Sequence, residues 1–303
     1  MAAIVTEGLT KYYGKTPGII DLDIEVNVGE VFGFLGPNGA GKSTTIRTLL
    51  HMLHPTSGSG TILGMDIRQD SVDIRRRIGY IPGDLAMYND MTAQQLFEYF
   101  SALRHADTKL MVEELAARFQ LDVNRKIGSY SSGNRQKVAI VQAFMHEPEL
   151  LILDEPSTGL DPLMQQEFYR MIDEVQSEGR TVFLSSHILP EVERLADRVG
   201  IVRESRLVAL ETVTALREKA VRRLEIVFAA PVDASLFSSL PGVRRSESTH
   251  TGRGVDIAVE GNLDQVMAAA GRHTIENIRS QEGDLEEAFL AFYAEDQADS
   301  DAS

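Results

Sequence analysis

Cysteine and tryptophan are both missing from this sequence of 303 residues. Without cysteine the chain can form neither a disulfide nor a thiolate metal site, which favours a reducing compartment. No run of 18 apolar residues occurs, and the N-terminus lacks a basic segment followed by an apolar one. We therefore expect neither a membrane span nor a signal peptide, and we expect the protein in the cytoplasm or docked on a structure that faces it.

Basic residues are few relative to acidic ones. Lysine and arginine number 30 against 45 aspartates and glutamates, which gives a net charge of −15. A surface this acidic repels a phosphate backbone, so the composition argues against nucleic acid as a partner. Hydrophobic residues make up 43% of the chain, which is enough to build a core, and the length predicts two domains.

Strands and helices alternate in the first two thirds of the chain. Apolar residues alternate with others from Ile20 to Val26, which predicts a half-buried strand. Further strands are predicted at 31–35, 150–153 and 181–184, and helices from residue 42 and over 162–176. This order predicts an α/β fold with a parallel sheet covered by helices. From about residue 90 to 146 the apolar period is helical, which predicts an α-helical insert.

The last third of the chain predicts a second, smaller domain. We assign residues 1–218 to the first domain, which a hairpin-like pair of strands and a helix close. Residues 219–294 follow the β-α-β-β-α-β order of a ferredoxin-like unit, so an α+β domain is expected. The periodicity predicts an amphipathic helix over 285–293, and the acidic tail at 295–303 is predicted to be disordered.

A glycine-rich loop carries the most specific chemical signal. Its sequence fits the phosphate-binding pattern G-x-x-x-x-G-K-[ST] and reads Gly36-Pro37-Asn38-Gly39-Ala40-Gly41-Lys42-Ser43-Thr44. Glycines let backbone N–H groups converge on phosphates, and the following helix adds the positive end of its dipole. Lys42 is expected to reach the β- and γ-phosphates and Ser43 to ligate Mg²⁺. A chance glycine turn is the alternative, which the position between strand and helix disfavours.

Acidic and imidazole side chains follow two other predicted strands. Asp154 can hold Mg²⁺, and Glu155 can polarise an attacking water. His187 can hydrogen-bond to a γ-phosphate. A surface acidic pair and a structural histidine are the alternatives, but the phosphate loop in the same chain favours catalytic roles.

A polar segment, residues 130–136 (YSSGNRQ), opens another predicted helix. The hydroxyl of Ser131 and the nearby backbone N–H groups can form an anion site at this helix N-terminus. A simple helix N-cap explains the same residues.

Together these motifs resemble the ATP-binding subunit of an ABC transporter, a P-loop NTPase with a mixed sheet and a helical insert. Residues 36–44 look like its Walker A, 150–156 its Walker B with catalytic Glu155, and 157–161 its D-loop, with His187 as the switch histidine. The resemblance covers residues 3 to about 215. It implies that Ser131 and Gly133 of the signature contact phosphate and that Tyr13 stacks on adenine.

Two motifs depart from the family pattern. Ser132 and Asn134 replace the usual Gly and Gln of the signature, but Ser131 and Gly133 remain. Gly83 stands where the family has the glutamine of the Q-loop. Since glycine has no side-chain ligand, a metal contact there must come from Asp84, from water or from nothing.

The resemblance implies ATP and Mg²⁺ as cofactors and a head-to-tail homodimer that sandwiches ATP between the phosphate loop of one copy and the signature of the other. It also implies an integral membrane permease as partner, docked at the helical insert near residues 75–84, with the chain peripheral on the inner face of the cell membrane. Weaker similarity in residues 80–88 and 284–289 points to the branch that serves drug, lipid or polysaccharide exporters. An accessory C-terminal domain that stabilises the dimer is implied there.

Two other functions remain open. An importer ATPase would carry a β-rich regulatory domain at its C-terminus. A soluble ABC ATPase acting on ribosomes or DNA usually has two cassettes or a long coiled coil, whereas this sequence has one cassette and a net charge of −15.

Overall fold

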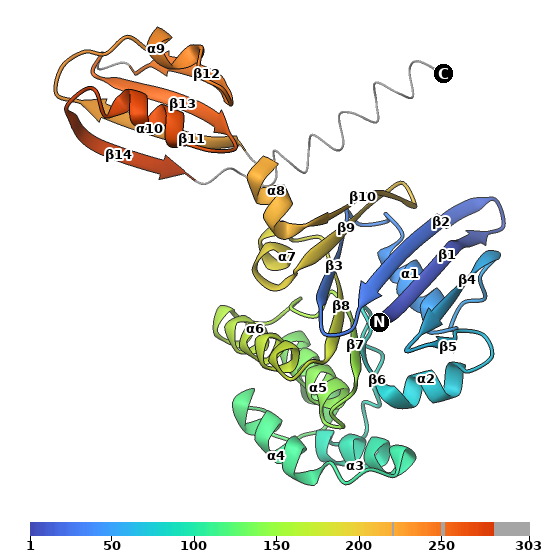
Figure 1. Ribbon diagram of the computed structural model, residues 1–303. Coiled ribbons are helices and arrows are strands. Elements are labelled where there is room, and N and C mark those ends of the chain that lie inside the picture. The colour runs from blue at the N-terminus through green and yellow to red at the C-terminus, as the bar shows by residue number, and fades with distance from the viewer. Residues whose placement is uncertain (220, 250–251, 282–303) are drawn as a thin grey trace. The chain divides into compact units, whose positions relative to one another are not determined.

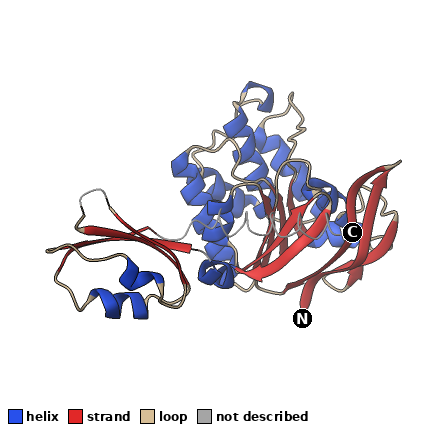
Figure 2. Cartoon of the chain, turned by 90° about the horizontal axis from the view of Figure 1, so that it is seen from above, coloured by secondary structure: helices blue, strands red, loops and turns tan. Residues whose placement is uncertain are grey.

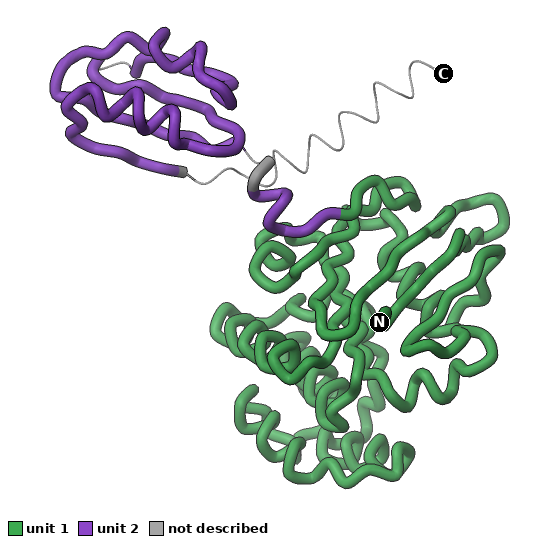
Figure 3. Tube along the Cα trace, viewed as in Figure 1, with its two compact units in different colours: residues 1–210 green, residues 211–303 purple. Residues whose placement is uncertain are grey.

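The structure, a computed structural model, describes residues 1–219, 221–249 and 252–281. It divides into two compact units, residues 1–210 and 211–303 (Figure 3). The sequence analysis places the boundary after residue 218, so the two divisions differ over residues 211–218. This stretch includes most of helix α8 (Val213–Lys219), which belongs to the second unit. The predicted helix at 285–293 and the acidic tail lie outside the described residues.

The central sheet of unit 1 has six strands in the order β10-β9-β3-β8-β7-β6. They are β3 (Val31–Leu35), β6 (Ile78–Ile81), β7 (Leu150–Asp154), β8 (Thr181–Ser186), β9 (Arg198–Arg203) and β10 (Arg206–Thr212). The pairs from β9 through β6 are parallel. Every residue of β3, β7 and β8 is buried, as expected of parallel strands covered on both faces. The predicted parallel sheet is confirmed.

A second, antiparallel sheet has the order β2-β1-β4-β5. Its strands are β1 (Ala2–Tyr13), β2 (Thr16–Asn27), β4 (Ser57–Ile62) and β5 (Met65–Asp66). In β2 the predicted alternation holds, with Leu22, Ile24 and Val26 buried. They share one core with Phe32 and Phe34 of the central sheet, so the two sheets form one unit.

Helices cover the central sheet and form the insert (Figure 1). Those outside the insert are α1 (Lys42–Leu49), α2 (Ser71–Arg77), α6 (Pro162–Ser177) and α7 (Leu189–Leu195). The insert consists of α3 (Ala93–Arg104), α4 (Lys109–Arg118), a 3₁₀ turn (Ile127–Ser129) and α5 (Ser132–Phe144). The predicted helical insert between residues 90 and 146 contains no strand.

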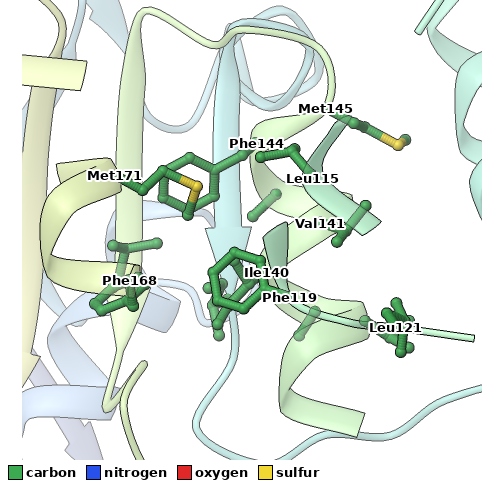
Figure 4. Close-up of a cluster of buried hydrophobic side chains, with 14 of the residues drawn as sticks. Leu115, Phe119, Leu121, Ile140, Val141, Phe144, Met145, Phe168 and Met171 are labelled. Atoms are coloured by element: carbon green, nitrogen blue, oxygen red, sulfur yellow. The ribbon is translucent and has the colours of Figure 1, made fainter. Parts of the chain in front are cut away.

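One buried cluster joins the insert to the rest of unit 1 (Figure 4). Leu115 comes from α4 and Phe119 is the C-cap of that helix, Phe144 comes from α5, and Phe168 and Met171 come from α6. The rings of Phe144 and Phe168 meet edge to face with centroids 6.4 Å apart, a favourable aromatic geometry. This packing fixes α5, and with it the signature segment at its N-terminus, against α6.

Unit 2 contains a four-stranded antiparallel sheet in the order β12-β13-β11-β14. Its elements are β11 (Val221–Phe228), α9 (Ser235–Ser238), β12 (Val243–Ser248), β13 (Gly254–Glu260), α10 (Asp264–Ala270) and β14 (Ile275–Gln281). The β-α-β-β-α-β order follows the sequence prediction. Both helices lie on one face of the sheet (Figure 2), over a core that includes Phe228 and Phe237. Kinship with ferredoxin-like domains stays a prediction.

Candidate functional site

The predicted phosphate loop runs from the end of β3 to the start of α1. Gly41 is the N-cap of α1 and has φ +107°, a conformation that strongly favours glycine. A Cβ there would also lie 2.3 Å from the carbonyl oxygen of Gly18. The exposed turn of Pro37, Asn38 and Gly39 precedes buried Ala40. The loop therefore presents backbone N–H groups and a helix N-terminus to one point, as anion binding requires.

Lys42 lies folded over this loop. Its ammonium donates hydrogen bonds to the carbonyl oxygens of Gly36 at 2.7 Å and Pro37 at 3.2 Å. It also lies 3.5 Å from Glu155 Oε1. With 5% of its surface exposed, this buried charge is held by partners that an incoming phosphate can replace.

The carboxyl of Asp154 ends β7 and is almost fully buried. Ser185 Oγ, directly opposite in β8, donates to its Oδ1 at 2.5 Å. Its Oδ2 is buried without a hydrogen-bond partner in the described part of the chain. A Cβ at Gly83 would lie 3.0 Å from this oxygen, so Oδ2 faces the space that glycine leaves. An unsatisfied carboxylate oxygen costs free energy, and a divalent cation would satisfy it.

Glu155 lies between Lys42 and His187 and contacts both side chains. Nδ1 of His187 lies 3.1 Å from Glu155 Oε1, the oxygen that also faces the lysine. Glu155 has φ +51°, which is unfavourable for a residue with a Cβ and typical of functional sites. A backbone hydrogen bond from its N–H to the carbonyl of Ser185 holds this conformation.

Tyr13 lies at the rim of the phosphate loop. Its hydroxyl is 3.4 Å from Thr44 Oγ1, and 47% of its surface is exposed. Lys11 Nζ lies 5.6 Å from the ring centroid. The exposed ring beside the loop is available to stack on a planar base.

The signature segment packs against the D-loop. Ser131 is the N-cap of α5 and accepts the N–H of Asn134, so the N-cap prediction is confirmed. A Cβ at Gly133 would lie 2.6 Å from the carbonyl oxygen of Gly159. In the described part of the chain, no hydrogen bond or ion pair joins Ser131 or Gly133 to the phosphate loop.

The loop after β6 contains the Q-loop departure. Asp84 is 95% exposed at its side chain and pairs with Arg47 of α1 at 3.3 Å. Tyr80 lies beside it, and burial, with the charge of Asp154 adding to the effect, raises the pKa of Tyr80 to about 12. Arg47 and Asp84 thus link α1 to this loop.

Three residues of the site escaped the sequence analysis. Ser185 donates to Asp154, Gln136 Nε2 donates to the carbonyl of Pro156 at 2.6 Å, and buried Glu191 accepts the hydroxyl of Ser186. Ser185 was detectable as the residue opposite Asp154 in the predicted parallel strands. Gln136 and Glu191 lie on helices, where sequence alone does not show which face is buried.

Comparison with known proteins agrees with this geometry. The family model described as ABC transporter matches residues 19–158. The bacitracin transport ATP-binding protein BcrA of Bacillus licheniformis is 41% identical over 207 residues, 67% of this chain and 68% of that protein. The chain belongs to the ABC transporter ATP-binding proteins. This ABC cassette is also 36% identical to the daunorubicin resistance ATP-binding protein DrrA3 of Streptomyces coeruleorubidus over 231 residues, 74% of this chain and 73% of that one.

Solved structures give the same assignment for the cassette fold. One described as the ATP-binding subunit of an ABC transporter has a TM-score of 0.67 and 30% identity, covering 71% of this chain and 92% of that one. The dimeric bacterial cassette MJ0796 has a TM-score of 0.64 at 20% identity, covering 69% and 98%, which shows the fold alone. The chain is an ATP-binding cassette ATPase subunit. Among the described helices, none is both long and apolar enough to cross a membrane.

Proposed function

We propose that this cassette hydrolyses ATP to drive export of a substrate through a separate membrane permease. The observation that carries the hydrolytic part is the approach of two side chains to one carboxylate oxygen of a third. Glu155 Oε1 lies 3.5 Å from the ammonium of Lys42 and 3.1 Å from Nδ1 of His187. A base between a phosphate-binding lysine and an imidazole suits the activation of water next to a γ-phosphate.

Each of these residues has its own role in ATP binding or hydrolysis. Residues 36–44 bind the phosphates, Lys42 exchanges its loop carbonyls for phosphate oxygens, and Tyr13 stacks on the base. Glu155 orients the attacking water, and His187 hydrogen-bonds to the γ-phosphate. Asp154 and Ser43 hold Mg²⁺, which neutralises phosphate charge when it is bound. The unpartnered Oδ2 of Asp154 supports this assignment, and Gly83 leaves room for a water ligand.

Two copies complete the site in this proposal. Gly133 packs against the D-loop of its own chain, and within the described residues no hydrogen bond or ion pair joins Ser131 or Gly133 to the phosphate loop, so we assign both residues to the ATP held by a partner copy. A head-to-tail dimer with two ATP molecules follows from that pairing.

Export is favoured by the names of the relatives. They include bacitracin transport and daunorubicin resistance proteins. The β-α-β-β-α-β order of unit 2 also differs from the β-rich domain expected of an importer ATPase. We place the cassette at the inner face of the cell membrane, on a permease bound near residues 75–84.

Affinity capture of the tagged full chain from detergent-solubilised native membranes tests the transporter assignment. A stoichiometric protein with several membrane spans supports the proposal. A substrate-binding protein from outside the membrane in the same complex favours import. Ribosomes, DNA or no partner would overturn the export function and leave the ATPase intact.

A further inference from the structure

A buried carboxyl that the proposed mechanism does not use lies in the helix that follows the switch histidine. Glu191 is in α7, four residues after His187, and only 3% of its surface is exposed. Its Oε1 is buried without a hydrogen-bond partner within the described residues. Glutamate is rarely placed so deep unless the carboxyl has a specific task.

One oxygen of this carboxyl fixes the turn that carries His187. Ser186 Oγ donates to Glu191 Oε2 at 2.6 Å and accepts the N–H of Ile188 at 3.0 Å. His187 lies between these two residues. The Ser186 hydroxyl therefore stabilises the turn that contains His187, and its hydrogen bond to Glu191 fixes the orientation of that hydroxyl.

The surroundings of this carboxyl raise its pKa. Burial raises the pKa of Glu191, the charge of Glu155 raises it further, and the hydroxyls of Ser157 and Ser186 oppose the rise. Ser157 is the first residue of the D-loop and is itself buried. Glu191 lies on the helix that follows β8, and its hydrogen bond is with Ser186 at the end of that strand.

We propose that Glu191 is a positioning residue, which orients His187 toward Glu155 by holding the Ser186 hydroxyl. The inference rests on the proposed roles of Glu155 and His187. The carboxyl touches neither nucleotide nor water in this scheme and acts only through the Ser186 hydroxyl. Its loss should therefore slow hydrolysis without weakening ATP binding.

Steady-state hydrolysis and equilibrium ATP binding by the full chain test this role in Glu191→Ala and Glu191→Gln. The alanine variant should lose about 10- to 100-fold in kcat, as misplaced catalytic groups do, with an unchanged Kd for ATP. The glutamine variant should keep most of kcat, because its amide oxygen still accepts the Ser186 hydroxyl. Glu193→Ala, on the same helix, is the matched control and should keep kcat.

A double-mutant cycle separates the link from general destabilisation. Ser186→Ala, which removes the hydroxyl but keeps the Glu191 side chain, should lower kcat with ATP affinity retained, and combining it with Glu191→Ala should cost no more than Glu191→Ala alone. Full kcat in Glu191→Ala, strictly additive losses, or a parallel loss of ATP affinity and melting temperature would overturn the inference. If instead Glu155→Gln hydrolyses ATP like the wild type, the proposed function fails, whatever Glu191 does.

Discussion

The left-handed backbone of Glu155 shows how the site is held at the level of single residues. A φ of +51° costs about 1–3 kcal/mol in a residue with a side chain. The Ser185 carbonyl, which accepts the Glu155 N–H, and the ion pair of the Glu155 carboxylate with Lys42 offset that cost. The strain turns the carboxylate toward Lys42 and His187, where an attacking water is needed.

Gly83 gives a prediction for the metal site. In Gly83→Ala the new Cβ would lie 3.0 Å from Asp154 Oδ2 and crowd the proposed ligand. We expect the Mg²⁺ concentration for half-maximal ATPase activity to rise about tenfold, as for other changes beside metal ligands. Titration of Mg²⁺ at fixed ATP measures this half-maximal concentration. Equal Mg²⁺ requirements in Gly83→Ala and wild type would contradict the assignment.

His146 gives a prediction for acid stability. Its Nε2 lies 3.0 Å from the carbonyl oxygen of Ile78, and burial lowers the pKa of His146 to about 4. Between about pH 6.5 and 4 the unfolded chain binds a proton here that the folded chain does not, so the free energy of unfolding falls as the pH falls. The loss should reach about 2–3 kcal/mol.

Urea unfolding of wild type and His146→Gln at pH 7 and pH 5 measures this contribution. The glutamine amide can still donate to Ile78, but it does not titrate. The variant should therefore lose less stability between the two pH values. An equal loss in both proteins would show that another group causes the acid sensitivity.

At the scale of elements, α6 connects the insert to the central sheet. Phe168→Ala removes a fully buried ring that contacts Phe144, and we expect it to lower the free energy of unfolding by about 3–5 kcal/mol. Leu163→Ala, in the same helix but 73% exposed, should change it by less than about 0.5 kcal/mol. Denaturant unfolding compares the two, and similar losses would contradict the role of this cluster.

The elements missed by the sequence analysis show where periodicity fails. β1 has four register irregularities against β2, so its buried residues do not alternate. The sequence Ser57-Gly58-Ser59-Gly60 resembles a turn, but it begins β4. A Cβ at Gly58 would lie 2.1 Å from the carbonyl oxygen of Gly8, which makes glycine a requirement of pairing with β1. The antiparallel sheet therefore could not be read from local patterns.

The site was more accessible to sequence analysis than this sheet. The phosphate loop, Asp154, Glu155 and His187 follow the ends of parallel strands, and such ends meet at one edge of the sheet. The approach of Lys42 and His187 to one oxygen of Glu155 depends on the strand order and on the backbone conformation of Glu155. Neither of these two features can be deduced from the spacing of residues in the sequence.

At the scale of the whole molecule, the two units have separate cores. Two buried clusters belong to unit 1, and the third, with Phe228 and Phe237, belongs to unit 2. Every residue proposed to bind or hydrolyse ATP lies in unit 1. Within one chain, the signature and the phosphate loop serve different ATP molecules in our proposal, so the working molecule contains two chains.

The most direct test of this account is the mass of Glu155→Gln in solution with saturating ATP and Mg²⁺, measured by light scattering alongside its ATPase rate. We predict that hydrolysis falls by a factor of about 100 or more and that the mass doubles with ATP but not with ADP. Lys42→Ala in the same background should stay monomeric, because it lacks the phosphate contact. A Glu155→Gln chain that hydrolyses ATP at the wild-type rate, or that remains a monomer with ATP bound, would contradict the account.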